Sequence, residues 1–339
     1  MTRIACNLNP AAGTIRRWRT AARKVVAPTG SWRGLSADRE RPDATVTGCE
    51  AHDTEPLVLS LQTAPQQDLV QSERLSELER FQIRFIQRSL EPGPLASVMK
   101  WCQRYLGATW ITLATRQMLH VHGFDRLPQL DPAQSYVMVA NHRTFFDLYA
   151  ITAYLVRRGL RHRILFPVRS AFFYDRPLGF FVNGVMSFFA MYPPIFRERK
   201  KLALNLASLD ELARQLRRGG VLAGIHPEGT RNQGPDPYRL LPAQRGVGRV
   251  VQAARVPVIP VFVNGLVGDL KAQLLNNFRP RDHQIVIVFG APVALDDLIQ
   301  QPSTPKVHQA IADRVLASVE QLGQEEREIR ERLEAARDR

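Results

Sequence analysis

Short apolar runs alternate with segments of helical periodicity through the middle of the chain. The runs of strand length are 120–124, 136–140, 163–168, 191–196, 221–225, 257–263 and 284–289. Two intervening segments, 145–158 and 200–218, repeat their apolar residues at the spacing of one helix face. This alternation predicts an α/β fold with a mixed, largely parallel central sheet that helices flank on both faces.

Two further helices are predicted before the first strand, at 72–90 and 95–119. The second contains Trp101, Trp110 and many other apolar residues, while its only charged residues are basic. Such a helix is typical of the membrane interface, although an ordinary core helix fits the pattern equally well. We interpret residues 71–119 as N-terminal membrane-interacting helices.

One stretch approaches the length of a transmembrane segment. Residues 178–196 form 19 consecutive positions without a charge, close to the number that spans a bilayer. Asn183, Gly184 and two prolines interrupt this stretch, and charged residues stand directly before it. The pattern therefore favours a buried or interfacial helix that runs into a strand.

The two ends of the chain lie outside this α/β pattern. Residues 1–70 show no periodicity and are predicted to be a disordered basic tail. Their first 33 residues include no acidic residue but carry Arg3, Arg16, Arg17, Arg19, Arg23, Lys24 and Arg33. Residues 301–339 are predicted to form a C-terminal charged helix, because charges of both signs recur at helical spacing. The α/β domain itself is predicted to occupy residues 120–300.

Composition narrows the possible partners and the compartment. A net charge of +14 suits an anionic membrane surface or an anionic substrate. Nucleic acid would match the charge as well, but no basic patch interleaved with aromatic residues supports it, so we expect no nucleic-acid partner. Cys6, Cys49 and Cys102 are far apart and form no CxxC pair. This excludes a disulfide framework or a zinc site and favours a reducing compartment.

A candidate catalytic pair stands where the strand at 136–140 turns into a helix. His142 follows the strand, and Asp147 lies five residues later, in the first turn of the helix predicted for 145–158. A histidine in this place could take a proton from a hydroxyl, while the aspartate orients the ring and stabilises the imidazolium.

The same spacing occurs twice more, at positions 120/125 and 308/313. In a strand an odd offset places two side chains on opposite faces, and within a helix five residues turn them apart. Only the pair at His142 can therefore meet. A structural alternative stays open, because Thr144 and Asp147 also match a helix capping box with Thr144 as the N-cap.

A second polar segment follows the strand at 221–225 and has the sequence His226-Pro227-Glu228-Gly229-Thr230-Arg231. Gly229 lets the backbone approach a ligand, and Arg231 can bind a phosphate through two hydrogen bonds. Glu228 could form a hydrogen bond with an acceptor hydroxyl. The structural alternative is a turn in which Arg231 pairs with Glu228.

Together these segments resemble the motifs of a known family. Asn141-His142 with Asp147, followed further along the chain by Pro227 to Arg231, are similar to the HxxxxD and PEGTR motifs of the glycerolipid acyltransferases of the lysophosphatidic acid acyltransferase type. Residues 194–197 are similar to the family's apolar strand end closed by an arginine, and residues 256–261 to its proline-bearing last motif. The resemblance covers roughly residues 95–290.

The resemblance implies an O-acyltransferase of phospholipid biosynthesis, associated with the cytoplasmic face of a membrane. His142 would act as general base on the hydroxyl of 1-acylglycerol-3-phosphate, and Asp147 would orient it. That hydroxyl would attack the thioester of acyl-CoA or acyl carrier protein (acyl-ACP), without an acyl-enzyme, a cofactor or a metal. The acceptor's phosphate and glycerol would be bound by Arg197, Glu228, Gly229, Thr230 and Arg231.

Some positions depart from the family pattern. His226 replaces the usual aromatic residue before the proline, Asn232 replaces a common serine, and Arg197 and Arg199 are both available as the second-motif arginine. These departures leave open an acyltransferase for another lysolipid or amino-lipid acceptor. A non-catalytic membrane-binding protein that keeps the fold is a further alternative. The sequence contains no GxSxG motif that would support a Ser-His-Asp hydrolase and no GxxxxGK motif that would support a nucleotide-binding enzyme.

Overall fold

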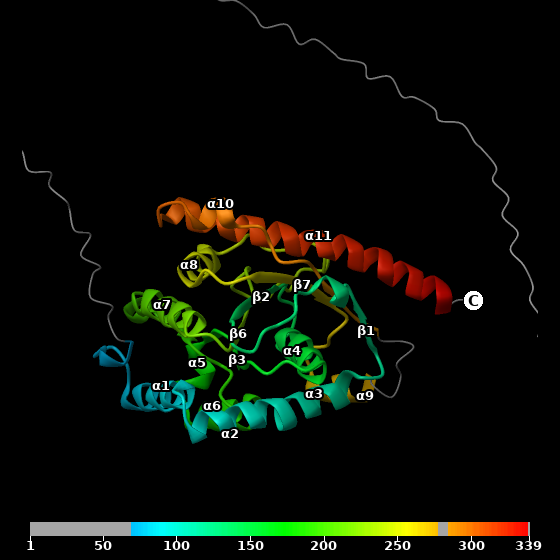
Figure 1. Ribbon diagram of the computed structural model, residues 1–339. Coiled ribbons are helices and arrows are strands. Elements are labelled where there is room, and N and C mark those ends of the chain that lie inside the picture. Colours follow the sequence, from blue (N-terminus) through cyan, green and yellow to red (C-terminus); the bar gives the residue numbers. More distant parts are fainter. Residues whose placement is uncertain (1–68, 277–283, 338–339) are drawn as a thin grey trace, which may run out of the picture. The chain divides into compact units, whose positions relative to one another are not determined.

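A six-stranded sheet in the order β1-β8-β7-β2-β6-β3 forms the centre of the computed structural model, which describes residues 69–276 and 284–337 (Figure 1). Its neighbouring strands are parallel, except that β7 and β8 run antiparallel. The prediction of a mixed, largely parallel sheet is confirmed. The strands are β1 Leu119–His122, β2 Tyr136–Ala140, β3 Arg163–Leu165, β6 Val221–Ile225, β7 Val258–Asn264 and β8 Ile285–Phe289.

Helices cover both faces of this sheet. On one face lie α7, α8 and α11, and on the other lie α3 and α4 (Figure 1). The longer helices are α1 Glu77–Leu90, α2 Pro94–Cys102, α3 Ala108–Thr115, α4 Asp147–Arg157, α6 Pro177–Ser187, α7 Leu204–Arg217, α8 Arg245–Ala254 and α11 Pro305–Arg337. The short ones are α5 Ser170–Phe173, α9 Leu270–Asn276 and α10 Asp296–Ile299.

The central position of β2 follows from its composition. All five of its residues are apolar and buried, because β6 and β7 flank the strand and helices cover both of its faces. The register pairs Val139 with Ile225 in the parallel strand β6. The segments that follow β2 and β6 therefore leave the sheet at the same edge, which is where ligands usually bind in α/β proteins.

Two predicted strands are shorter than the sequence pattern indicated. The run at 163–168 splits into β3 and a separate two-residue strand, β4 (Val168–Arg169), and the run at 191–196 contributes only β5 (Pro194–Ile195). The strands β4 and β5 pair with each other in a second small sheet. Pro193 and Pro194 lack backbone N–H donors, which limits the ladder that this apolar run can form.

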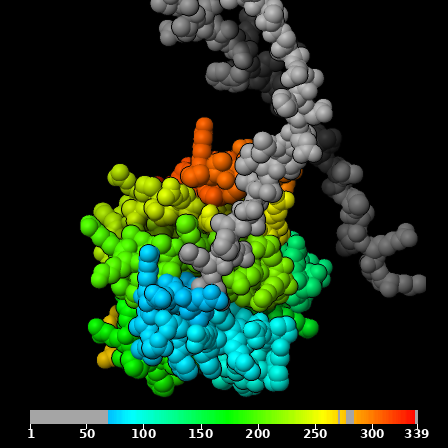
Figure 2. Space-filling view, turned by 90° about the vertical axis from the view of Figure 1, so that its left-hand side faces the viewer, coloured from blue at the N-terminus to red at the C-terminus, as the bar shows by residue number. Residues whose placement is uncertain are grey.

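The N-terminal helices combine a buried and an exposed side. In α1 and α3, Ile83, Ile86 and Ile111 belong to the main core, whereas α2 contains no buried residue. A π-helical turn, Gln103–Gly107, joins α2 to α3. Figure 2 shows α1 and α2, in blue and cyan, along the lower edge of the molecule. Residues 1–68, and with them nearly all of the predicted basic tail, lie outside the described part of the chain.

The two tryptophans of this region differ sharply. The indole N–H of Trp110 donates to the carbonyl of Met186, and its ring contacts Tyr149, so this half-buried residue packs against the core. The side chain of Trp101 is 55% exposed. Core and interface characteristics thus occur on the same helical segment. Within the described residues, no helix combines the length and the apolar character needed to cross a membrane.

Candidate active site

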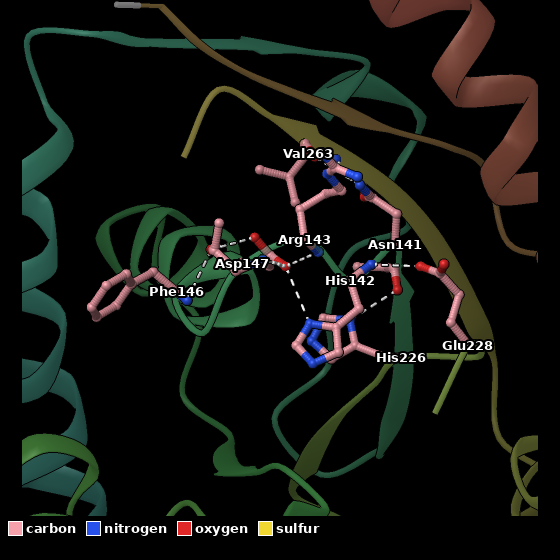
Figure 3. Close-up of polar contacts among 10 residues, drawn as sticks. Asn141, His142, Arg143, Phe146, Asp147, His226, Glu228 and Val263 are labelled. Carbon is pink, nitrogen blue, oxygen red and sulfur yellow. Dashed lines mark hydrogen bonds and ion pairs between the residues drawn. The ribbon is translucent and has the colours of Figure 1, made fainter. Parts of the chain in front are cut away.

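Asp147 lies at the first residue of α4 and holds the turn that follows β2. Its Oδ2 accepts hydrogen bonds from the backbone N–H groups of Arg143 (2.7 Å) and Thr144 (2.8 Å) and lies 3.3 Å from Nδ1 of His142 (Figure 3). Its Oδ1 accepts the hydroxyl of Thr144 at 2.6 Å. The carboxylate is 1% exposed. The predicted meeting of His142 and Asp147 is thus observed.

The capping-box interpretation of this turn is wrong in its main feature. The N-cap of α4 is Phe146, which makes no side-chain capping bond, and the hydroxyl of Thr144 accepts the N–H of Phe146 instead of that of Asp147. The reciprocal half does occur, since the carboxylate of Asp147 accepts the backbone N–H of Thr144. Asp147 therefore both shapes the turn and reaches the ring of His142.

The peptide unit of His142 is fixed by the segment that follows β6. Its N–H donates to Oε1 of Glu228 at 2.8 Å, and its carbonyl accepts the N–H of Asn232 at 2.7 Å. The second carboxylate oxygen, Oε2 of Glu228, accepts the N–H of Leu241 at 2.8 Å. Burial raises the pKa of the Glu228 carboxyl, although its two backbone hydrogen bonds oppose that shift.

These contacts change how Glu228 is interpreted. Its side chain is 1% exposed and bridges two backbone segments, and among the described residues no ion pair links it to Arg231. The alternative of a turn closed by an Arg231–Glu228 pair is therefore wrong. A direct contact between Glu228 and an acceptor hydroxyl stays a prediction.

Asn141 links the turn after β2 to the neighbouring strand β7. Its Nδ2 donates to the carbonyl of Val263, and its Oδ1 accepts the N–H of Val263, both at 2.8 Å. The amide side chain is fully buried and continues the β2–β7 ladder beyond the last backbone pair. The sequence indicates Asn141 only as part of a motif. Its contact with Val263 cannot be predicted locally, because the two residues are 122 positions apart.

The ring of His226 stacks on the ring of His142. The centroids are 3.7 Å apart, and the ring planes differ by 8° (Figure 3). Nδ1 of His226 lies 3.0 Å from the carbonyl of Ala140. A carbonyl oxygen only accepts, so this nitrogen carries the proton, and Nε2 keeps a lone pair. Burial, with a smaller contribution from the neighbouring His142, lowers the pKa of His226 to about 3.

His142, Asp147 and His226 bring potential metal-binding atoms within 4.8 Å of one another. Their geometry fits a metal ion poorly. The lone pairs of two stacked imidazoles lie in parallel planes and do not converge on one point, and a tetrahedral or octahedral ion needs converging ligands. We therefore assign no metal to this group.

The remaining predicted residues lie on an exposed rim beside His142. Nη2 of Arg197 donates to the carbonyl of Gly229 at 3.2 Å, which brings the end of β5 against the loop after β6. Arg199 instead begins a short 3₁₀ turn. Gly229 has a φ of +66°, and a Cβ there would meet Gln244 at 2.8 Å, so this turn requires glycine. The side chains of Thr230 and Arg231 are exposed.

A small pocket, separate from this rim, lies between α3, α4 and α6. Most of its lining side chains are apolar, among them Tyr149, Ala153, Phe166 and Met186.

Comparisons with known proteins agree with these observations. Residues 118–264 match the family model described as Acyltransferase. The chain is 28% identical over 203 residues to 1-acyl-sn-glycerol-3-phosphate acyltransferase alpha of Homo sapiens, a match that covers 59% of this chain and 62% of the relative. The corresponding enzyme of Cocos nucifera is 25% identical over 161 residues, 48% of this chain and 46% of the relative.

The chain thus spans about three fifths of the length of the human alpha relative. Among solved structures, it is similar to the crystal structure of the 1-acyl-sn-glycerophosphate (LPA) acyltransferase PlsC from Thermotoga maritima, with 18% sequence identity and a TM-score of 0.42. That match covers 71% of this chain and 88% of the other.

Proposed function

We propose that the protein moves a fatty acyl group from a thioester to the free hydroxyl of 1-acylglycerol-3-phosphate. The match of residues 118–264 to the acyltransferase family model and the similarity to 1-acyl-sn-glycerol-3-phosphate acyltransferases support this proposal. The donor is acyl-CoA or acyl-ACP. The observation that supports this proposal most is the contact of His142 Nδ1 with the Asp147 carboxylate. The carboxylate keeps the proton on Nδ1 and leaves Nε2 available as a base.

In the proposed reaction, Nε2 of His142 removes the proton of the acceptor hydroxyl as its oxygen attacks the thioester carbonyl. The tetrahedral intermediate then expels the thiolate, the carbon–sulfur bond breaks, and the thiolate takes the proton back from the imidazolium. An ester and a free thiol are the products, so the histidine ends the cycle neutral. Asp147 stabilises the positive ring between the two steps.

Acceptor binding in this proposal uses the exposed rim. Arg197, Thr230 and Arg231 are solvent-exposed cations and hydroxyl groups beside the base and suit a phosphate, which arginine binds with charge-assisted hydrogen bonds. The contact of Arg197 with Gly229 supports Arg197 rather than Arg199 as the second-motif arginine.

Release of thiol from a long-chain acyl-CoA in mixed micelles tests this function. With 1-acylglycerol-3-phosphate present, we expect release by the wild type and a loss of about 10²-fold or more in His142→Ala. In the same assay Arg197→Ala should raise the KM for the acceptor, whereas Arg199→Ala serves as the matched control and should not.

Other outcomes would redirect the assignment. Release that does not depend on the acceptor would indicate a thioesterase, and turnover with another lysolipid only would change the acceptor. Silence with CoA and carrier-protein donors across a panel of acceptors, together with intact vesicle binding, would favour a non-catalytic membrane-binding protein.

A further inference from the structure

Two contacts fix the ring of His226 in place. Its face covers the ring of the base at 3.7 Å, and its Nδ1–H donates to the carbonyl of Ala140, the last residue of β2. The register of β2 against β6 sets this arrangement, because Val139 lies opposite Ile225. The second histidine is therefore built into the edge of the sheet beside the base.

We propose that His226 is a positioning residue for the acyl-transfer reaction: its ring fixes the plane of His142, and its aromatic face stabilises the imidazolium that forms when His142 takes the acceptor's proton. This inference rests on the proposed role of His142 as the general base. It assigns a role to the position where the sequence departs from the aromatic residue usual in the family.

The charge distribution around the stack favours this role. A cation over an aromatic face is attracted by the electron density of the ring. Burial lowers the pKa of His226 to about 3, so at neutral pH His226 presents a neutral face and never a second positive charge. The other ionisable groups placed against His142 are the carboxyls of Asp147 and Glu228, which also favour a positive ring.

The orientation of His142 depends on His226 for a geometric reason. Asp147 contacts only Nδ1 of His142, at a long 3.3 Å, and a single contact leaves the ring able to rotate about that point. A parallel ring at 3.7 Å removes this rotation, because any tilt would bring atoms of the two rings into collision. Nε2 then keeps one direction toward the bound hydroxyl.

The matched variants His226→Phe and His226→Leu separate the aromatic face from simple filling of space. Both lose the hydrogen bond to Ala140, but only Phe keeps an aromatic ring against His142. With ¹³C-labelled histidine in the full chain, NMR titration should give a His142 pKa about half a unit lower in the Leu variant than in the Phe variant. The acid limb of kcat/KM against pH should move by the same amount, and kcat should be lower in the Leu variant.

The NMR measurement keeps the two proposals distinguishable. If the wild type and both variants are inactive with every donor and acceptor but the pKa difference is present, the stack is supported and the proposed function fails. Equal His142 pKa values and equal kcat in the Phe and Leu variants would overturn the inference, since His226 would then only fill space. Should the Leu variant not fold, His226→Met provides the same comparison with a flexible apolar side chain.

Discussion

At the scale of single residues, the two carboxylate oxygens of Asp147 both hold the turn after β2 and contact the ring of His142. Oδ2 accepts two backbone N–H groups and contacts His142, and Oδ1 accepts the hydroxyl of Thr144. Asparagine could keep this network, because the two backbone donors would hold its amide oxygen in the place of Oδ2. Its NH₂ group could donate to the Thr144 hydroxyl, which is able to accept.

Asp147→Asn should therefore fold normally and lose mainly the negative charge. We expect kcat to fall by about 10²-fold with little change in KM, because the imidazolium loses its counter-charge while the ring stays oriented. Acyl-transfer kinetics and the urea midpoint measure the two effects, and Asp147→Ala is the control that also disrupts the turn. Full activity in Asp147→Asn would show that the carboxylate acts only on the turn.

The pair His142 and Asp147 could be predicted from sequence because both lie on one continuous strand–turn–helix segment. His226 could be recognised only as an unusual residue, since its stacking depends on the β2–β6 register across 86 positions. The contacts of Glu228 could not be predicted from sequence either. Its side chain is buried and accepts the backbone N–H of His142, whereas the sequence also allowed a pair with Arg231. Local sequence patterns thus predict contacts between residues close in the chain, whereas contacts such as the His226–His142 stack depend on how distant strands pair.

At the scale of elements, α2 and α6 present an unusual amount of apolar surface. Trp101 on α2 is 55% exposed, Tyr105 in the π-helical turn after α2 is 51% exposed, and on α6 Leu178 and Phe181 are 62% and 64% exposed. Both helices lie in the lower part of Figure 1, and α6 contacts the π-helical turn that follows α2. Basic residues occur in the same region, including Arg104 over the ring of Tyr105. We propose that this face rests on the membrane that supplies the lipid acceptor.

Binding to vesicles that contain anionic lipid checks this proposal. Trp101→Glu and Phe181→Glu should each weaken partitioning by about tenfold or more, because each removes a large buried aromatic from the interface and adds a charge. Leu206→Glu on α7 is the control, since Leu206 is 55% exposed but lies on a different element. Equal losses for all three variants would contradict a specific docking face.

The strands and helices differ in how well sequence periodicity predicts them. The predictions for β2 and β6 match the observed strands, because five consecutive apolar residues bounded by polar turns leave little choice. The helix α8 was not predicted. Its ten residues include Gly246 and Gly248, which lower helix propensity, and its stability comes from packing against α7 and α11. The spacing of Val247, Val250, Val251 and Ala254 does match one helix face, so the local pattern was present and the two glycines obscured it.

At the scale of the whole molecule, folding lowers the pKa of several histidines. Burial is the largest cause for His120, His162, His226 and His308. In the unfolded chain these rings bind protons near pH 6.5, whereas in the folded protein they bind them only at lower pH. Below about pH 6.5 the unfolded state therefore holds more protons than the folded state, and the free energy of unfolding should fall as the pH falls.

His226 makes this effect measurable one residue at a time. Its folded pKa is about 3, so its contribution to the free energy of unfolding should decline by about 1.4 kcal/mol per pH unit below pH 6. His226→Phe has no proton to gain at this position. Between pH 6 and pH 4, the unfolding free energy of the wild type should therefore fall, relative to that of His226→Phe, by about 1.4 kcal/mol for each pH unit.

Urea unfolding at pH 7, 6, 5 and 4 gives this difference directly. Buried carboxyls such as Glu228, whose pKa is raised, titrate in the same range with the opposite sign, but they are present in both proteins and cancel in the difference. Parallel pH profiles for the two proteins would mean that His226 accepts a proton in the folded state near pH 6. A second positive charge would then lie against the imidazolium, and the aromatic face could not stabilise it.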